Sequence, residues 1–179
     1  MRFPPPFIQV FPMYVSVRPA ALRAGLAGLM LASSAFPATA ATDIEVAAGV
    51  STTTDREFTR AASVAWLPEL WQLDRAMLRA DVGVVYVDGR GDVRDRDLGD
   101  DVWVGYVGLR YERTDNGLVL GAAIGAQSGE TDAISGDPQF ITTAGWRWDR
   151  FSLLLRHISN ASLHSPNNGE TGLAAAWRF

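Results

Sequence analysis

The residues with the clearest capacity for chemistry lie in one short segment close to the C-terminus, residues 156–170. This segment carries imidazole, hydroxyl, carboxamide and carboxylate groups, on His157, Ser159, Asn160 and Glu170. A serine beside a histidine can act as a nucleophile activated by a general base, and a carboxylate can orient that base and stabilise its charged form. The segment therefore contains the residue types of a serine hydrolase.

Two strands are expected to position these groups. Along residues 151–159 the alternation puts His157 and Ser159 on one face of a strand, about 6 to 7 Å apart along the backbone. Glu170 opens the next expected strand, and pairing of the two strands can bring its carboxylate to the other nitrogen of the imidazole. Asn160 can donate a hydrogen bond to the oxyanion that forms on an attacked carbonyl.

The chain from Ala41 onward is organised as eight runs of about ten residues with a period of two. The runs cover residues 44–51, 58–67, 76–87, 102–113, 118–129, 138–148, 151–159 and 171–179. Sustained helical periodicity is absent from this part of the sequence. The pattern predicts an all-β chain of eight antiparallel strands, with tight turns at Asn116-Gly117 and Asp149-Arg150.

In most runs one face is bulky and apolar, and the other is small, polar or charged. In a water-soluble sandwich the bulky face would form the core. Here the second face is rich in glycine and alanine, and five charged residues share it: Arg79, Asp81, Arg110, Glu112 and Arg147. This composition suits the crowded interior of a narrow barrel, and the bulky face would then meet lipid. We therefore predict an eight-stranded antiparallel transmembrane β-barrel.

Loop lengths and aromatic residues agree with this prediction, because outer-membrane barrels have short periplasmic turns, longer external loops and two aromatic girdles. With both termini in the periplasm, the two tight turns and residues 68–75 fall inside. The longer segments fall outside: residues 52–57, 88–101, 130–137 and 160–169. The expected periplasmic girdle contains Trp66, Tyr111, Trp146, Trp148, Phe151, Trp177 and Phe179, and the outer girdle contains Phe58, Tyr86 and Trp103.

The first forty residues have the features of an export signal. Two arginines precede an apolar run from Ala24 to Phe36, and Ala38-Thr39-Ala40 supplies the small residues of a cleavage site. The apolar run is shorter than the roughly 20 residues that a membrane-spanning helix needs. We expect residues 1–40 to be a signal peptide that is removed, and residues 41–179 to form the barrel domain in the bacterial outer membrane.

Composition limits the partners. The net charge of −4 comes with no basic stripe, which argues against a nucleic-acid partner. Because there is no cysteine, disulfides, thiolate metal sites and cysteine nucleophiles are excluded. The spacing of His157, His164 and Glu170 fits no familiar zinc pattern, so we expect no metal and no cofactor. The sequence leaves the oligomeric state open, and a homodimer is compatible with it.

The C-terminal segment resembles the PagL family of lipid A 3-O-deacylases. The resemblance lies in His157-x-Ser159-Asn160-Ala161, followed by Pro166-Asn167-x-Gly169-Glu170, on the last hairpin of an eight-stranded barrel. It covers this hairpin closely and the rest of the mature chain only in architecture. One departure is Ser162, which stands where many relatives are expected to have glycine.

The resemblance implies that Ser159 is the nucleophile, His157 the general base, Glu170 its acidic partner and Asn160 an oxyanion-hole donor. It also implies that the chain hydrolyses the ester at the 3-position of lipid A in lipopolysaccharide and releases a 3-hydroxy fatty acid. Two alternatives stay open. One is a non-enzymatic small barrel with a structural or adhesion role, and the other is a lipid A acyltransferase on a similar barrel.

All sixteen basic residues are arginines. Arg60, Arg90 or Arg156 could pair with the phosphates of lipid A, because a guanidinium matches phosphate geometry. Genomic base composition would explain the arginine bias equally well.

Overall fold

The computed structural model describes residues 43–179 except residues 92 and 94. The expected signal peptide, residues 1–40, lies outside the described residues. No helix in the described part of the chain is long and apolar enough to cross a membrane.

Nine strands follow one another within the described residues. They are β1 (Ile44–Thr53), β2 (Phe58–Trp66), β3 (Glu69–Gln72), β4 (Ala76–Val87), β5 (Val102–Arg113), β6 (Leu118–Ser128), β7 (Gln139–Trp148), β8 (Phe151–Ser159) and β9 (Glu170–Arg178). Each of the eight predicted runs corresponds to one strand, and no end differs by more than two residues.

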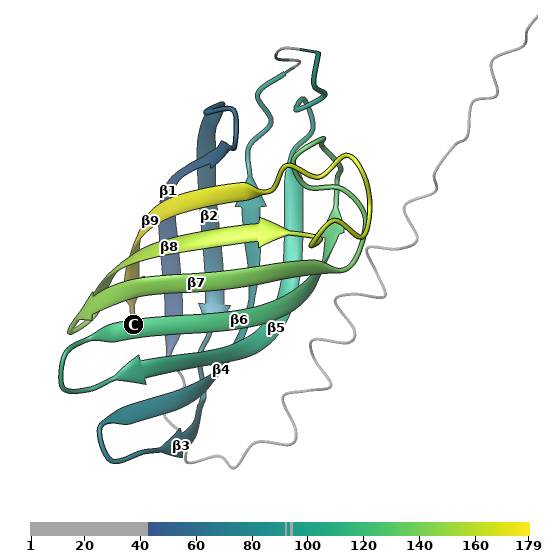
Figure 1. Ribbon diagram of the computed structural model, residues 1–179. Helices are drawn as coiled ribbons and strands as arrows, with labels where there is room; N and C mark the ends of the chain where they lie inside the picture. The colour runs from purple at the N-terminus through teal and green to yellow at the C-terminus, as the bar shows by residue number, and fades with distance from the viewer. Residues whose placement is uncertain (1–42, 92, 94) are drawn as a thin grey trace, which may run out of the picture. The chain divides into compact units, whose positions relative to one another are not determined.

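Eight of these strands form a closed antiparallel barrel (Figure 1). From β4 to β9 each strand pairs with the next, β9 pairs with β1, and β1 pairs with β2. Pairing of β2 with β4 closes the ring. The predicted eight-stranded antiparallel barrel is therefore confirmed. Closure gives every strand of the ring two neighbours, which is the condition for a sheet to lie in hydrocarbon.

The short strand β3 lies outside the ring, in the segment for which the sequence suggested only a turn. It pairs with Met77–Arg79 of β4, whereas β2 pairs with β4 only from Val82 to Val87. Because β4 is longer than the stretch that β2 covers, its first residues need another partner for their backbone groups. The prediction missed β3 because four residues are too few to show alternation.

The strands turn their bulky apolar side chains outward, as predicted. On β1, Val46 and Val50 are exposed, while Glu45 and Ala47 are buried in the interior. The same alternation repeats around the barrel and leaves a continuous belt of exposed apolar side chains. Such a belt is the lipid-facing surface of a transmembrane barrel.

Buried charges are paired inside the barrel. Arg110 lies 2.6 Å from a carboxylate oxygen of Glu45 and 2.9 Å from one of Asp81. The Arg178 guanidinium donates a hydrogen bond of 2.9 Å to the Glu112 carboxylate. The same carboxylate accepts a hydrogen bond of 3.1 Å from Arg79. Four of the five charges predicted for the interior, all except Arg147, are fully buried there. Arg147 is partly exposed and reaches to 3.7 Å from Glu112.

The two ends of the barrel differ. At one end, which we call the turn end, the strands are connected by the short segments 114–117 and 149–150. Trp148 stacks on Phe151 there, with 5.9 Å between the ring centroids. At the opposite end, the loop end, the connections are residues 54–57, 88–101, 129–138 and 160–169. There Tyr86 packs against Trp103, with 4.7 Å between the ring centroids. Leu98 and Ile134 from two of these loops are buried against the barrel interior, so the loops fold into the mouth.

Candidate functional site

His157 and Ser159 lie on the outer face of β8 at the loop end. His157 is exposed and Ser159 is half-buried, while Ile158 between them points into the barrel. The alternation that turns Leu153 and Leu155 outward carries both polar groups to the same surface. A hydroxyl and an imidazole thus lie on the outer surface, at the edge of the apolar belt that is nearest the loop end.

The ring of His157 is held by Thr171 on β9. These residues are direct partners in the β8–β9 pairing, and the His157 Nδ1 atom lies 2.9 Å from the Thr171 Oγ1 atom. When Nδ1 carries the proton and donates it to this hydroxyl, Nε2 is free to accept a proton. Gly169 makes room for the ring, since a Cβ atom at this position would lie 2.8 Å from His157 Cε1.

Ser159 is two residues from His157 along the strand. Within the described part of the chain, no hydrogen bond joins the Ser159 hydroxyl to the imidazole. Two residues of a β-strand span about 6 to 7 Å, so contact requires the two side chains to rotate toward each other. Catalytic hydrogen bonds are often long or unformed before substrate binds.

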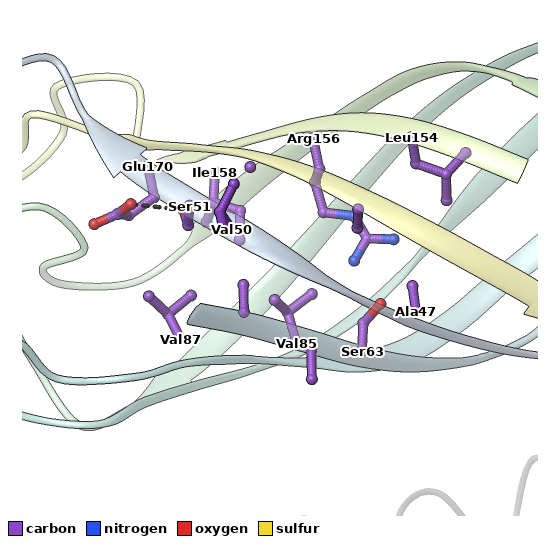
Figure 2. A pocket seen from close by; sticks show the side chains of 14 residues that line it. Ala47, Val50, Ser51, Ser63, Val85, Val87, Leu154, Arg156, Ile158 and Glu170 are labelled. Carbon is purple, nitrogen blue, oxygen red and sulfur yellow. Dashed lines mark hydrogen bonds between the residues drawn. The ribbon is translucent and has the colours of Figure 1, made fainter. Parts of the chain in front are cut away.

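The structure does not bring Glu170 to His157. Glu170 is the strand partner of Ile158, so its side chain points into the barrel and is 1% exposed. There its carboxylate accepts a hydrogen bond of 2.6 Å from Ser51 (Figure 2). The same carboxylate pairs with the guanidinium of Arg90. Strand pairing therefore does not bring the Glu170 carboxylate to the imidazole, contrary to the expectation from the sequence. The residue opposite His157 is Thr171, the next residue in the chain.

Asn160 is also turned inward, and both N–H groups of its side-chain amide already have acceptors. It is fully buried, and its Nδ2 group donates to the backbone carbonyls of Ser135 and of His164, the latter at 3.0 Å. Both N–H bonds of the amide are therefore used within the loops. This corrects the expectation that the Asn160 side chain donates to an oxyanion at the outer surface.

His164 joins two loops at the loop end. Its Nε2 atom lies 2.8 Å from the backbone oxygen of Asp137, and its ring covers Gly136, where a Cβ atom would meet the ring at 2.6 Å. The backbone N–H of Gly169 donates to the oxygen of Ala133 at 3.0 Å. The loop of residues 160–169 is therefore fixed to the loop of residues 129–138, and this contact holds the backbone next to His157.

The three arginines considered as phosphate partners lie in different environments. Arg90 enters the barrel mouth toward Glu170, and burial lowers the pKa of its guanidinium. Arg156 points inward and lines a small internal pocket (Figure 2). Its guanidinium carbon lies 5.6 Å from the centre of the Tyr106 ring. Only Arg60 of the three belongs to the outward-facing, exposed series of its strand.

Thr171 is the functional candidate that the sequence analysis missed, although a signal was present. Leu173 and Trp177 belong to the bulky outer face of the last strand, and Thr171 is in phase with them. His157 is outward-facing, so its cross-strand partner must be outward-facing too. The alternation along the last strand therefore identifies Thr171 as the residue that faces His157, and it turns Glu170 to the opposite face. Among the described residues, no group of three His, Asp or Glu side chains could hold a metal ion.

Comparison with known proteins supports the fold. No protein-family model and no curated protein sequence matches the chain. The crystal structure of the outer membrane enzyme PagL matches with a TM-score of 0.54 and 20% identity, over 75% of this chain and 98% of that one. The outer membrane protein Ail of Yersinia pestis, in a phospholipid nanodisc, matches with a TM-score of 0.45 and 15% identity, over 76% and 99% of the two chains.

A third match is Neisserial surface protein A, with a TM-score of 0.42 and 12% identity, over 76% of this chain and 94% of that one. At these identities the likeness shows the fold alone. The chain has the small eight-stranded barrel fold of bacterial outer-membrane proteins.

Proposed function

We propose that this chain is an outer-membrane esterase that hydrolyses the 3-position ester of lipid A in the outer leaflet and releases a 3-hydroxy fatty acid. The observation that carries the proposal is the position of Ser159 and His157, on the apolar outer surface of the barrel at its loop end. With the loop end directed outward from the cell, both groups lie where the esters of an outer-leaflet glycolipid are found. The substrate then reaches the site without leaving the membrane.

In the proposed reaction, Ser159 Oγ attacks the ester carbonyl while His157 Nε2 accepts the hydroxyl proton. The tetrahedral intermediate collapses, the imidazolium returns the proton to the departing sugar oxygen, and the fatty acyl group stays on Ser159. A water molecule, deprotonated by His157, then attacks the acyl-enzyme. The bond between the acyl carbon and Ser159 Oγ breaks, the imidazolium returns its proton to Oγ, and the fatty acid is released. Thr171 accepts the hydrogen bond from Nδ1–H and so keeps the productive tautomer.

The oxyanion donors in this proposal come from the backbone. Ala161 and Ser162, which follow Asn160 after the end of β8, have φ angles of 53° and 65°. A turn in such conformations can direct successive N–H groups to one side, as in known anion-binding turns. We assign the oxyanion to these N–H groups, since the Asn160 side chain is occupied within the loops.

The test uses purified protein in detergent with lipopolysaccharide, and mass spectrometry of the lipid A product. Wild-type protein should remove one 3-hydroxy acyl group. Ser159→Ala should abolish the release, whereas Ser128→Ala should leave it unchanged, because Ser128 is an exposed residue at the loop end of β6. Full activity of a correctly folded Ser159→Ala protein would exclude Ser159 as the nucleophile.

A non-enzymatic barrel is the second candidate, and one observation favours it. No carboxylate contacts the His157 ring within the described part of the chain. This candidate predicts unchanged lipid A in cells that overproduce the protein. An acyltransferase would instead add acyl mass to a lipid, so mass spectrometry of lipid A separates the three functions.

A further inference from the structure

We propose that Arg60 and the apolar hollow beside it bind a phosphorylated, acylated glycolipid of the outer leaflet, with a phosphate on the guanidinium and an acyl chain in the hollow. The proposal rests on the outer-leaflet location and substrate class proposed above. It adds where the phosphate lies, on strand β2, away from Ser159. Binding there does not require Ser159 to act as a nucleophile.

Arg60 lies on the outward-facing surface of β2, and its guanidinium has no ion-pair partner among the described residues. It is the third residue of β2, counted from the loop end, and belongs to the exposed series that includes Phe58 and Val64. An arginine on the lipid face of a barrel is unfavourable unless it reaches the interface or a counter-charge. The planar guanidinium binds phosphate in a bidentate manner.

The register places Arg60 on the same outer surface as the candidate site. Phe58 of β2, Thr52 of β1, and Thr171 and His157 of β9 and β8 form one row of paired positions across four neighbouring strands. Arg60 lies one outward-facing position below Phe58. Three steps of about 4.8 Å between neighbouring strands separate His157 from Phe58 along this row, about 14 Å in all, and Arg60 lies about 7 Å from Phe58 along β2 toward the turn end.

This separation favours a glycolipid as the occupant. A disaccharide headgroup with phosphates and several ester-linked chains is wide enough to lie over both positions. A glycerophospholipid, in which one phosphate lies next to two esters, is too narrow to do so. We therefore commit to the phosphorylated glycolipid, and a glycerophospholipid becomes an outcome of the test.

A hollow of about 230 Å³ in the outer surface begins at Ala62, two residues from Arg60 along β2. Its outward-facing lining consists of Val46, Ala62, Val64, Val84, Tyr86 and Trp103. Ala62 is the next outward-facing residue after Arg60, and its strand partner Ala48 is equally small. The small side chains leave room for an acyl chain between the larger residues of β1 and β4, and the charged head stays at the loop end.

The experiment measures binding alone, in a Ser159→Ala background, so that a failure of the proposed hydrolysis does not affect the result. The folded barrel in neutral detergent is titrated with diphosphoryl hexa-acyl lipid A and followed by native mass spectrometry. Arg60→Gln should weaken binding by on the order of tenfold, the effect of one charge-assisted contact. Arg60→Lys should bind more tightly than Arg60→Gln. Arg75→Gln should bind as the parent does, because Arg75 is an exposed arginine at the turn end.

A second pair of variants tests the hollow. Ala62→Phe should weaken binding by filling the hollow, whereas Ala122→Phe should not, because Ala122 is an outward-facing alanine of β6, away from the hollow. Unchanged binding by Arg60→Gln would overturn the phosphate assignment, and unchanged binding by Ala62→Phe would overturn the acyl assignment. Equal competition by phosphatidylglycerol would show a glycerophospholipid occupant and overturn the choice of glycolipid. Heat-dependent gel mobility identifies folded barrels, and Arg60→Lys supplies the comparison should Arg60→Gln not fold.

Discussion

The chemistry of the candidate site depends on which of two neighbouring residues faces the imidazole. Glu170 carries the charge that would stabilise an imidazolium, but it lies inside the barrel with Ser51 and Arg90. Thr171 faces the ring and can fix its tautomer, but its hydroxyl carries no charge. The candidate site therefore has an oriented imidazole without the charged partner that serine hydrolases use.

Supplying that charge should increase the rate. Thr171→Glu places a carboxylate at the position opposite His157, and we expect on the order of tenfold faster release of the fatty acid, since the charged partner in such triads contributes strongly. Thr171→Val should slow the release, because Nδ1 loses its acceptor. Initial rates of 3-hydroxy fatty acid release, measured by mass spectrometry, test both variants. A Thr171→Val protein as active as the wild type would show that this hydroxyl does not position the base.

At the scale of elements, the hairpin of β8 and β9 orients the His157 ring. The loops at the loop end in turn contact and order this hairpin. The loop of residues 160–169 is bonded to the loop of residues 129–138 through Asn160, His164 and Gly169. The Arg90–Glu170 pair fixes residues 88–101 to the first residue of β9. Two of the residues first considered for catalysis and phosphate binding thus serve to order the loop end.

Breaking this pair should loosen the loop rather than stop the chemistry. Glu170→Gln leaves the buried guanidinium of Arg90 without its counter-charge, and breaking such a pair typically costs about 3 kcal/mol. We expect faster hydrogen exchange in residues 88–101 and a smaller loss of activity than in Ser159→Ala. The double variant that carries both Glu170→Gln and Arg90→Gln should show a smaller increase in hydrogen exchange than the sum of the increases in the two single variants. Complete inactivation by Glu170→Gln, with unchanged exchange, would instead support a direct catalytic role for Glu170.

Much of this arrangement could be predicted from the sequence, because a period of two assigns each side chain to a face without knowledge of contacts. That rule placed His157 outward and Arg110 inward. Applied to the last strand, it also selects Thr171, in phase with Leu173, over Glu170. The contact of Asn160 with the carbonyl of Ser135 could not be predicted, since Ser135 lies 25 residues away in another loop that meets Asn160 only in the folded barrel. Strand β3 was missed because it completes the pairing of β4 and has no pattern of its own.

At the scale of the whole molecule, the barrel separates two tasks. The interior pairs its charges, Arg110 with Glu45 and Asp81 for example, and joins strands that are distant in the chain. The exterior presents an apolar belt with a few polar groups near the loop end. A site on such an exterior acts on molecules within the membrane plane, so both proposals depend on the belt facing hydrocarbon.

A pair of arginine substitutions tests that dependence directly. Val107, on β5, and Leu163, in the loop of residues 160–169, are similarly exposed, at 56% and 59%. In water the two substitutions would have similar, small effects. In a bilayer, Val107→Arg should lower the free energy of unfolding by about 2 to 4 kcal/mol, whereas Leu163→Arg, beyond the strands, should change it little. Urea titrations of the barrel folded into liposomes, followed by gel mobility, measure the difference. Equal effects would place the belt outside the hydrocarbon, and the route by which a lipid ester reaches Ser159 would be lost.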